Sequence, residues 1–358
     1  MLTGPTRVGD NDLVPDLATL GWDDAWSVAF TPYRERGLTP GRVAIRHRGA
    51  YDVLTTEGDV RARIAGRLRK DTPATGLPVV GDWVALDPAE TIVRVLPRRT
   101  KLSRRAAHEE GSDDVREQVI AANLDVVFIA ASFGDELDAR LLERYVTLAL
   151  ESGARPVLLL TKADLEPDPD VARQDLARID AQIPVHAVST RSGRGLDAVR
   201  ARLAPNLTGA LVGPSGVGKS TLVNALAGQD DLLATGAVRA DGQGRHTTTR
   251  RQLVILPGGG LIVDNPGMRE VHLWLAQEGL TEAFDDIAAL AGGCRFSDCS
   301  HESEPGCAVQ AALAEGRLTP ERWERYRAQR DELAELQDRL VRRERSRARR
   351  RRPDAGAS

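Results

Sequence analysis

A glycine-rich segment near the middle of the chain has the residue types and spacing that bind a phosphate group. Residues 213–221, GPSGVGKST, fit the pattern G-x-x-x-x-G-K-[ST] in full. Glycines allow the backbone to wind around an anion with its N–H groups pointing inward, and the helix that follows turns its positive end to the same anion. In this pattern Lys219 reaches the β- and γ-phosphates and Ser220 binds Mg²⁺. A surface turn is the alternative, and the flanking strand-like and helix-like runs disfavour it. The predicted loop consists of Gly213, Pro214, Ser215, Gly216, Val217, Gly218, Lys219, Ser220 and Thr221.

Two downstream segments offer groups for the same cation and phosphate. An apolar strand ends at Asp264, whose carboxylate would hold Mg²⁺ through a water, and Gly267 would bring its N–H to the γ-phosphate. Between the glycine-rich loop and this strand lies GRHTTTR, residues 244–250. Thr249, or Thr248 beside it, would complete the Mg²⁺ shell and sense hydrolysis. A polar hairpin tip is the alternative for residues 244–250.

A four-residue motif upstream, at the end of another apolar run, fits recognition of guanine. The motif consists of Thr161, Lys162, Ala163 and Asp164. The Asp164 carboxylate would accept hydrogen bonds from guanine N1–H and N2–H, whereas adenine would leave this charge unpaired at a cost of several kcal/mol. Lys162 would lay its stem along the base, and the N–H groups of Ser189 and Thr190 would bond O6. A helix start capped by Thr161 is the alternative.

All three cysteines of the chain lie in one short segment with a histidine, Cys294-x₄-Cys299-x-His301-x₅-Cys307. Three thiolates and an imidazole are a tetrahedral Zn²⁺ ligand set, and four protein ligands leave no open position, so one structural zinc per chain is predicted. The alternative is three free thiols beside a chance histidine, which the polar surroundings disfavour. An odd, clustered set of cysteines also argues for a reducing compartment, the cytoplasm.

Length and composition favour a multidomain soluble protein. The chain has 358 residues, of which 41% are hydrophobic and 28% charged. This length suggests two or three domains, and no apolar run approaches the roughly 18 residues of a membrane span. The start of the chain lacks the basic and apolar pattern of a secretory signal. The net charge of −3 hides a basic tail, because residues 339–352 carry +8.

The first third of the chain predicts a small β-barrel of the oligonucleotide-binding kind. Residues 1–40 form a polar N-terminal extension, and residues 41–105 show short β-like runs separated by turn residues. From residue 42 to 105 there are 14 Lys or Arg against seven Asp or Glu. This basic segment fits an RNA-binding barrel. A surface made soluble by arginine explains the composition equally well. Residues 106–118 form a linker.

The rest of the chain predicts an α/β domain followed by a metal-binding and helical region. Residues 119–285 alternate apolar runs with amphipathic segments, which is typical of a mostly parallel sheet covered by helices. Residues 286–352 hold the cysteine cluster and a long helix over 321–350, with Thr319 as its N-cap. The arginine-rich end of this helix would bind phosphate backbones or stay solvated. Residues 353–358 form a tail.

The order of these motifs is unusual, because the base-reading motif precedes the phosphate loop. This is a circular permutation of the usual GTP-binding order, which the closeness of domain termini permits. In its motifs and their order, from about residue 42 to 307, the chain resembles one family, the ribosome small-subunit-dependent GTPases known as RsgA or YjeQ. The resemblance rests on five segments: 161–164, 213–221, 244–249, 264–267 and the Cys/His cluster.

The resemblance implies a barrel, a permuted GTPase domain and a zinc domain. It further implies weak intrinsic GTPase activity, stimulation by the small ribosomal subunit and its rRNA, and a role in late maturation of that subunit. We expect a monomer that binds GTP and GDP and no membrane. Thr161 replaces the usual Asn, so a contact that ties loops around the base should weaken, and Asn265 replaces the usual Thr with little effect expected.

The group that orients the hydrolytic water is not obvious, because Met268 occupies the position where many GTPases have Gln. The resemblance implies a class with an apolar residue there. His246 is our catalytic candidate beside Lys219 and Thr249, because an imidazole can accept a hydrogen bond from water. Packing or RNA binding by His246 is an equal alternative. Two other functions also remain open: a P-loop ATPase or kinase, and an RNA-binding scaffold with a passive nucleotide switch.

Overall fold

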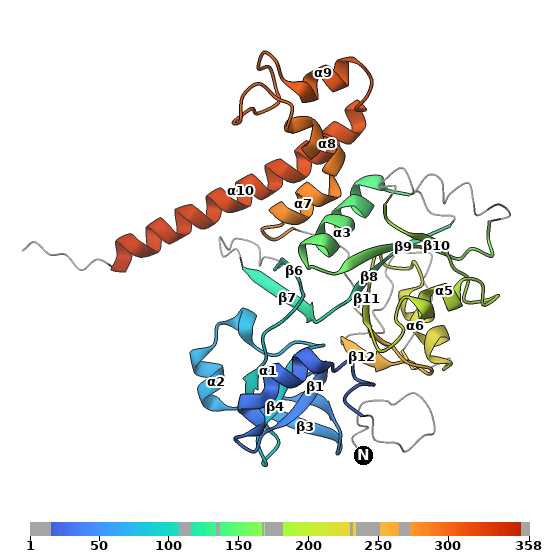
Figure 1. Cartoon of the computed structure of the whole chain (residues 1–358), viewed down its shortest axis with the longest axis vertical. Helices are drawn as coiled ribbons and strands as arrows, with labels where there is room; N and C mark the ends of the chain where they lie inside the picture. The colour runs from blue at the N-terminus through green and yellow to red at the C-terminus, as the bar shows by residue number, and fades with distance from the viewer. Residues whose placement is uncertain are drawn as a thin grey trace, which may run out of the picture.

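The computed structural model describes residues 16–106, 116–133, 137–166, 168, 182–229, 232–233, 251–264 and 273–351. The predicted site residues His246, Thr249 and Gly267 lie outside these ranges, as does Met268. Within the ranges, no helix is both long and apolar enough to cross a bilayer. Three units follow one another: a barrel, a helix-covered sheet and a helical C-terminal region (Figure 1).

The N-terminal unit is a closed five-stranded barrel, as predicted. Its strands run in the order β1-β2-β3-β5-β4, and β4 pairs back onto β1 to close the barrel. All neighbouring pairs are antiparallel except β3 with β5. Alternating apolar residues such as Val43, Val53 and Ile92 fill the interior. The elements are β1 (Thr39–Arg46), β2 (Tyr51–Thr55), β3 (Gly58–Ile64), α2 (Gly66–Asp71), a 3₁₀ turn (Ala74–Gly76), β4 (Trp83–Leu86) and β5 (Thr91–Val95).

A helix that precedes the barrel packs against its wall. In α1 (Asp24–Arg34), the Asp23 carboxylate caps the first turn by accepting a hydrogen bond from the Trp26 N–H at 2.9 Å. The Trp22 ring packs edge-on against Trp83 with ring centroids 4.6 Å apart, and Trp26 lies beside both. Residues 16–40 of the predicted extension are therefore structurally part of the barrel unit.

The barrel and the central sheet share one hydrogen-bonded ladder, because Ile45 of β1 pairs with Gln252 of β12 (Gln252–Ile255). Arg42 crosses this junction in a buried position. Its guanidinium donates to the Thr208 hydroxyl at 2.8 Å and also bonds backbone carbonyls from both units. Burial lowers the pKa of Arg42 to about 10, so it stays charged at neutral pH and holds the units together.

The central sheet is mostly parallel, as predicted. Its order is β10-β9-β8-β11-β13-β12, and only β12, at the barrel side, runs antiparallel. Side chains of β8 alternate between two cores: Ile129 faces α3, whereas Phe128 faces α5 and α6. The elements are β8 (Val126–Ser132), α3 (Ala139–Glu151), β9 (Arg155–Thr161), β10 (Val185–Ala187), α5 (Leu196–Ala201), β11 (Thr208–Val212), α6 (Lys219–Ala227) and β13 (Leu261–Asp264).

A β-hairpin lies between the barrel and the sheet. Its strands β6 (Lys101–Arg105) and β7 (Glu117–Ala122) pair antiparallel, with Arg104 opposite Gln118. Glu117 and Gln118, which fall in the predicted linker, begin β7. The hairpin contacts the C-terminal end of α3, where the Lys101 N–H donates to the Ser152 carbonyl at 3.0 Å.

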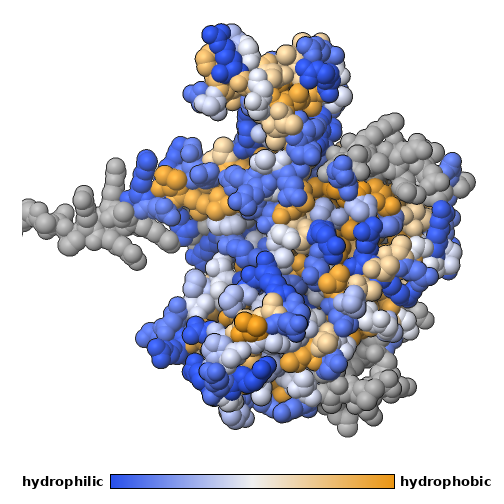
Figure 2. Space-filling view, in the orientation of Figure 1, coloured by the Kyte–Doolittle hydropathy of each residue, from blue (hydrophilic) through white to orange (hydrophobic). Residues whose placement is uncertain are grey.

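The C-terminal region consists of four helices, of which the last extends away from the body (Figure 1). They are α7 (Gln277–Ala283), α8 (Asp285–Ala291), α9 (Ala308–Ala314) and α10 (Pro320–Arg351). The Thr319 hydroxyl accepts a 3.3 Å hydrogen bond from the Arg322 N–H, as its predicted capping role requires. Figure 2 shows that hydrophilic side chains cover much of the barrel face in view.

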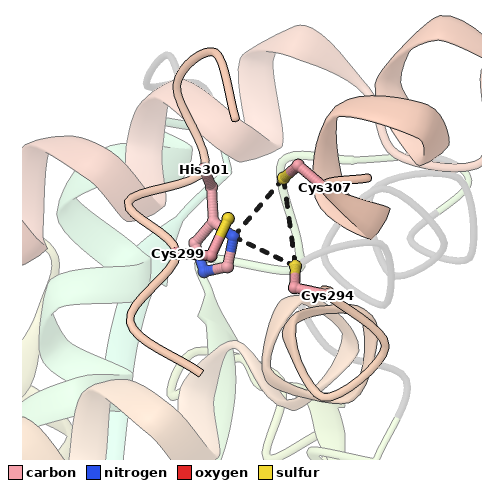
Figure 3. A group of neighbouring side chains, drawn as sticks. All are labelled: Cys294, Cys299, His301 and Cys307. Carbon is pink, nitrogen blue, oxygen red and sulfur yellow. Dashed lines mark hydrogen bonds between the residues drawn. The ribbon is translucent and has the colours of Figure 1, made fainter. Parts of the chain in front are cut away.

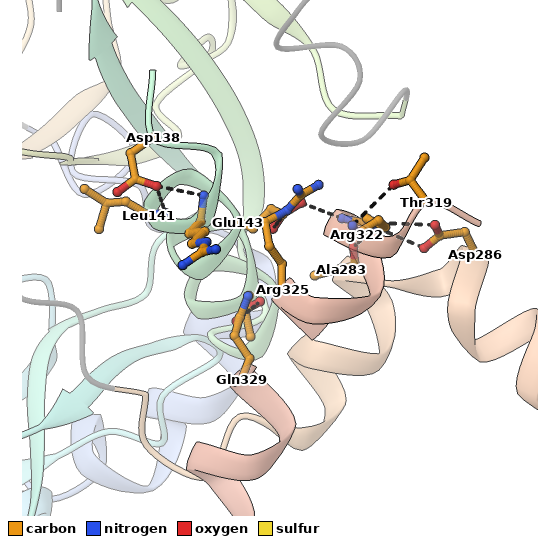
Figure 4. A network of polar contacts seen from close by, with 11 residues as sticks. Asp138, Leu141, Glu143, Ala283, Asp286, Thr319, Arg322, Arg325 and Gln329 are labelled. Carbon is orange, nitrogen blue, oxygen red and sulfur yellow. Dashed lines mark hydrogen bonds and ion pairs between the residues drawn. The ribbon is translucent and has the colours of Figure 1, made fainter. Parts of the chain in front are cut away.

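A buried carboxylate fixes α10 to the central unit (Figure 4). Glu143, on α3, accepts hydrogen bonds from Arg322 at 2.8 Å and Arg325 at 2.7 Å, and its side chain is only 2% exposed. Arg322 also donates to the Asp286 carboxylate and to the Ala283 carbonyl. Since two guanidinium groups satisfy one desolvated carboxylate, the pairing holds three helical segments in a fixed relation.

We predict that E143A lowers the thermal midpoint of the full chain by about 5–10 °C, because it removes the carboxylate that Arg322 and Arg325 share and leaves Arg322, among the described residues, only its ion pair with Asp286. Calorimetry measures the shift. The matched control is D286N, which removes a half-exposed carboxylate from the same Arg322 and should lower the midpoint by only about 1–3 °C. Equal shifts of the midpoint in the two variants would contradict the view that Glu143 fixes α10 to the central unit.

Candidate functional site

The phosphate loop connects β11 to α6 through a backbone that only glycine adopts easily. Gly213, Gly216 and Gly218 have φ angles of +141°, +85° and +91°. A Cβ atom on Gly213 would lie 2.4 Å from the Ala130 carbonyl oxygen, so this strand end tolerates no side chain. The predicted Pro214, Ser215 and Val217 complete the turn, and Thr221 lies in the first turn of α6.

Lys219 folds back over this loop. Its ammonium donates to the Gly213 carbonyl at 2.9 Å and the Pro214 carbonyl at 2.5 Å, and the residue is only 8% exposed. Burial lowers the pKa of Lys219 to about 8, while the charge of Asp264 opposes the shift. The ammonium is thus held at the centre of the loop by neutral carbonyls, which a phosphate anion would replace as a stronger partner.

Asp264 lies beside the start of α6, as the motif predicts. It is fully buried, and the Ser220 hydroxyl donates to its Oδ2 at 3.4 Å. Its Oδ1 is buried and has no hydrogen-bond partner among the described residues. Burial raises the pKa of Asp264 to about 6 against the opposing charge of Lys219. A carboxylate with an unsatisfied oxygen beside a hydroxyl fits a hard, oxygen-preferring cation.

The base-reading motif forms a loop directly after β9. Asp164 is exposed, and its carboxylate accepts a 2.6 Å hydrogen bond from the Ser189 hydroxyl, which lowers the pKa of Asp164. The Ser189 N–H donates to the Arg194 carbonyl at 2.9 Å, so this one of the two predicted O6 donors already has an acceptor within the chain. The sequence did not indicate that the Ser189 hydroxyl would support Asp164, because no motif links these two residues.

Thr161 connects this loop to the phosphate loop. Its buried hydroxyl lies 2.6 Å from the Val217 carbonyl and 3.0 Å from the Ala131 carbonyl, and it can donate its proton to either. The Ala163 N–H donates to the Val188 carbonyl at 3.1 Å, while Lys162 turns the chain with a φ of +56°. The shorter hydroxyl therefore still reaches the neighbouring loop.

The cysteine cluster forms a compact set of potential metal ligands (Figure 3). Cys294 Sγ lies 3.9 Å from Cys307 Sγ, and His301 Nδ1 lies 3.4 and 3.5 Å from these two sulfurs. With Cys299 Sγ included, all four ligand atoms lie within 4.8 Å of one another. Such convergence of three thiols and an imidazole on one point is what a metal ion requires.

Backbone N–H groups support two of these thiols. Ala308 donates to Cys294 Sγ and Gln310 to Cys307 Sγ, each at 3.4 Å, where α9 begins. The Gln310 side chain also donates to the His301 carbonyl at 2.6 Å. Hydrogen bonds of this kind orient ligands and stabilise thiolate charge, so the surroundings also fit a metal centre.

Comparison with known families agrees with the geometry. The family model described as RsgA GTPase matches residues 95–274, which include the base-reading motif, the phosphate loop and Asp264. The chain belongs to the RsgA GTPase family. A family relative in Opitutus terrae, named small ribosomal subunit biogenesis GTPase RsgA, is 43% identical over 325 residues, covering 87% of this chain and 88% of the relative. A relative with the same name in Streptomyces coelicolor is 46% identical over 319 residues, covering 87% and 85%.

Solved structures of related proteins share the fold. The crystal structure of YjeQ from Thermotoga maritima is 26% identical, with a TM-score of 0.60 over 83% of this chain and 99% of that chain. YloQ, described as a circularly permuted GTPase, is 23% identical, with a TM-score of 0.57 over 84% of this chain and 96% of that chain. The permuted order predicted from the sequence is therefore a property of the fold.

We predict that the purified chain carries one metal ion per chain at the Cys/His cluster and that C307S loses it. Removal of one thiolate from a four-ligand site leaves an incomplete tetrahedron. Elemental analysis measures the metal, and proteolysis measures the order of residues 292–307. The control is S297A, an exposed neighbour in the same loop, which should retain the metal. Full metal content in C307S would contradict the assignment.

Proposed function

We propose that this chain is a GTPase that binds the small ribosomal subunit and assists its late maturation, hydrolysing GTP to GDP and phosphate with stimulation by the subunit. One observation carries the proposal. The three motifs far apart in sequence follow β9, β11 and β13, which are parallel, so they gather at one edge of the sheet. Nucleotide sites of open α/β sheets lie at the carboxyl ends of the strands.

The identity of the partner is supported by the relatives. Those in Opitutus terrae and Streptomyces coelicolor are named for small ribosomal subunit biogenesis. In this chain the basic barrel and the arginine-rich end of α10 offer positively charged surfaces to rRNA, and the metal module is a third candidate contact. We propose that the protein acts on the subunit as a monomer in the cytoplasm.

The metal at the cysteine cluster would be zinc in a structural role. Tetrahedral zinc with bonds of about 2.3 Å to sulfur and about 2.0 Å to nitrogen places neighbouring sulfurs about 3.8 Å apart and sulfur and nitrogen about 3.5 Å apart. The observed separations are 3.9 Å for the sulfur pair and 3.4 and 3.5 Å for the sulfur–nitrogen pairs. Four protein ligands leave no position for a substrate.

The residues of the phosphate loop would bind the β- and γ-phosphates through inward N–H groups. Lys219 would exchange its bonds to the Gly213 and Pro214 carbonyls for bonds to phosphate oxygens. Ser220 and Asp264 would hold Mg²⁺, with Thr249 as the predicted third group. When bound, Mg²⁺ neutralises the charge that develops on the transferred phosphoryl group.

The water that attacks the γ-phosphate needs an orienting group, and Met268 has no polar atom to supply it. We propose His246, three positions before Thr249 in the sequence, because a neutral imidazole accepts a hydrogen bond from water. The second candidate role for His246 is contact with RNA. This second role would change the affinity for the subunit instead of the rate of hydrolysis.

We predict that D164N weakens GDP binding by about 100-fold or more, because an amide cannot accept both hydrogen bonds of the guanine edge. Competition against labelled GTP measures it, and ADP should not compete with the parent chain. The control is S189A, which leaves the carboxylate in place and should weaken binding only about fivefold. Equal competition by ADP and GDP would favour the ATPase or kinase alternative.

The proposed function is tested by the rate of GTP hydrolysis with and without purified small subunits across a salt series. We expect strong stimulation at low salt that vanishes at high salt, because phosphate contacts release counterions. An absence of stimulation at every salt concentration would reject the proposal in favour of a passive nucleotide switch.

We predict that H246A slows the stimulated rate by about 100-fold and leaves GTP affinity near that of the parent, as expected for loss of a water-orienting group. Single-turnover hydrolysis with saturating subunits separates the rate from binding. Unchanged turnover at saturation, with a weaker affinity for the subunit, would assign His246 to RNA contact.

A further inference from the structure

Two arginines lie opposite each other where the barrel joins the central sheet, and a third, on the hairpin, is near enough for its charge to act on one of them. Arg46 ends β1, Arg251 directly precedes β12, and Arg104 lies on β6 of the hairpin. Because Ile45 pairs with Gln252, the next position along this antiparallel ladder sets Arg46 opposite Arg251, with both side chains on one face. Among the described residues, the charges that act on Arg251 are those of Arg104 and Arg46, and both are positive.

Arg251 has no compensating anion among its described neighbours. The residue is partly buried, and its Nε is fully buried without a hydrogen-bond partner in the described part of the chain. Burial and the two positive neighbours together lower the pKa of Arg251 to about 10, so the guanidinium is still charged at neutral pH. A buried donor and a charge without a described counter-ion are both unfavourable, so an anion would stabilise the site.

Other buried arginines of this protein are compensated. Asp82 accepts from Arg98 at 2.8 Å, and Glu143 accepts from Arg322 at 2.8 Å. Arg42 has the Thr208 hydroxyl and backbone carbonyls as acceptors. Within the described part of the chain these three arginines therefore have acceptors, whereas none is found there for the buried Nε of Arg251.

We propose that Arg46, Arg104 and Arg251 bind a phosphate group of an RNA strand. Guanidinium groups present planar pairs of donors that match phosphate oxygens, and Arg104 donates from its Nε to Gln118 Oε1 at 3.0 Å. The cluster is continuous with the basic barrel, where an extended polyanion fits better than an isolated anion. This inference rests on the proposed function and specifies one contact of it.

The cluster also lies close to the nucleotide site through the sheet. Gln252, next to Arg251, pairs with Asp264 across β12 and β13. An RNA phosphate bound by Arg251 would thus contact the strand adjacent to the predicted Mg²⁺ carboxylate. Such proximity would give the RNA contact a short route to the proposed site of hydrolysis.

The test compares R46Q, R104Q and R251Q with the parent full chain, each saturated with a non-hydrolysable GTP analogue. We expect each substitution to weaken binding to purified small subunits about tenfold at low salt and to reduce the slope of log affinity against log salt by about one. The control is R200Q on α5, whose guanidinium pairs with Asp197 at 3.0 Å; it should match the parent. Parental affinity and slope in all three variants would overturn the proposal.

A thermal measurement separates ligand binding from a structural role. Because R251Q removes repulsion, its midpoint in low salt should equal or exceed that of the parent, and inorganic phosphate should stabilise the parent more than R251Q. A lower midpoint for R251Q with an unchanged salt slope would mean a structural arginine. Stabilisation by phosphate with unchanged subunit binding would mean a free-phosphate site, and loss of GTP-analogue affinity would mean a nucleotide contact. Both would overturn the RNA assignment.

Failure of the proposed function can be distinguished from failure of the RNA-phosphate site. If the parent does not bind small subunits at all, that function fails, and the same variants are then compared for binding to a single-stranded RNA oligonucleotide. Weaker binding by the three variants, with R200Q unchanged, would still support the RNA-phosphate site. Equal binding by all of them would reject it.

Discussion

Two opposite charges kept out of water, Lys219 and Asp264, are the constraint on which the rest of the structure depends. Burial moves the pKa of the lysine to about 8 and of the carboxyl to about 6, so each charge is held at some expense to the empty protein. The glycines permit the path of the phosphate loop, and the strand ends align this loop. Both features keep Lys219 and Asp264 close together. A nucleotide and cation bound as we propose would give both groups oppositely charged partners, and this would favour binding.

Much of this arrangement could be predicted because its signals are local. The phosphate loop, the motif at 161–164 and the cysteine cluster are each contained in a few contiguous residues, and alternating apolar runs are enough to indicate a barrel and a parallel sheet. Their order alone indicated the permutation. The roles of His246 and Thr249 stay predictions, since both lie outside the described residues.

What the sequence could not indicate are contacts between distant residues. Trp22 packs on Trp83, and Glu143 pairs with Arg322, 179 positions later. No sequence pattern predicts either contact. Thr161 is a second case in which the sequence could not indicate a side-chain contact. A shorter side chain predicted a weaker tie between the two loops, yet the backbone carbonyl of Val217 lies within its reach. Side-chain geometry of this kind follows from packing, which spacing does not encode.

The ladder between β1 and β12 has a consequence for exchanging parts among relatives. A barrel connected only by a flexible tether could be replaced as a module, but here Ile45 pairs with Gln252 and Arg42 donates to Thr208 across the junction. A chimera would have to inherit β12 and the start of β11 together with the foreign barrel. Evolution of the two units is therefore expected to be correlated at these few positions and free elsewhere along their surfaces.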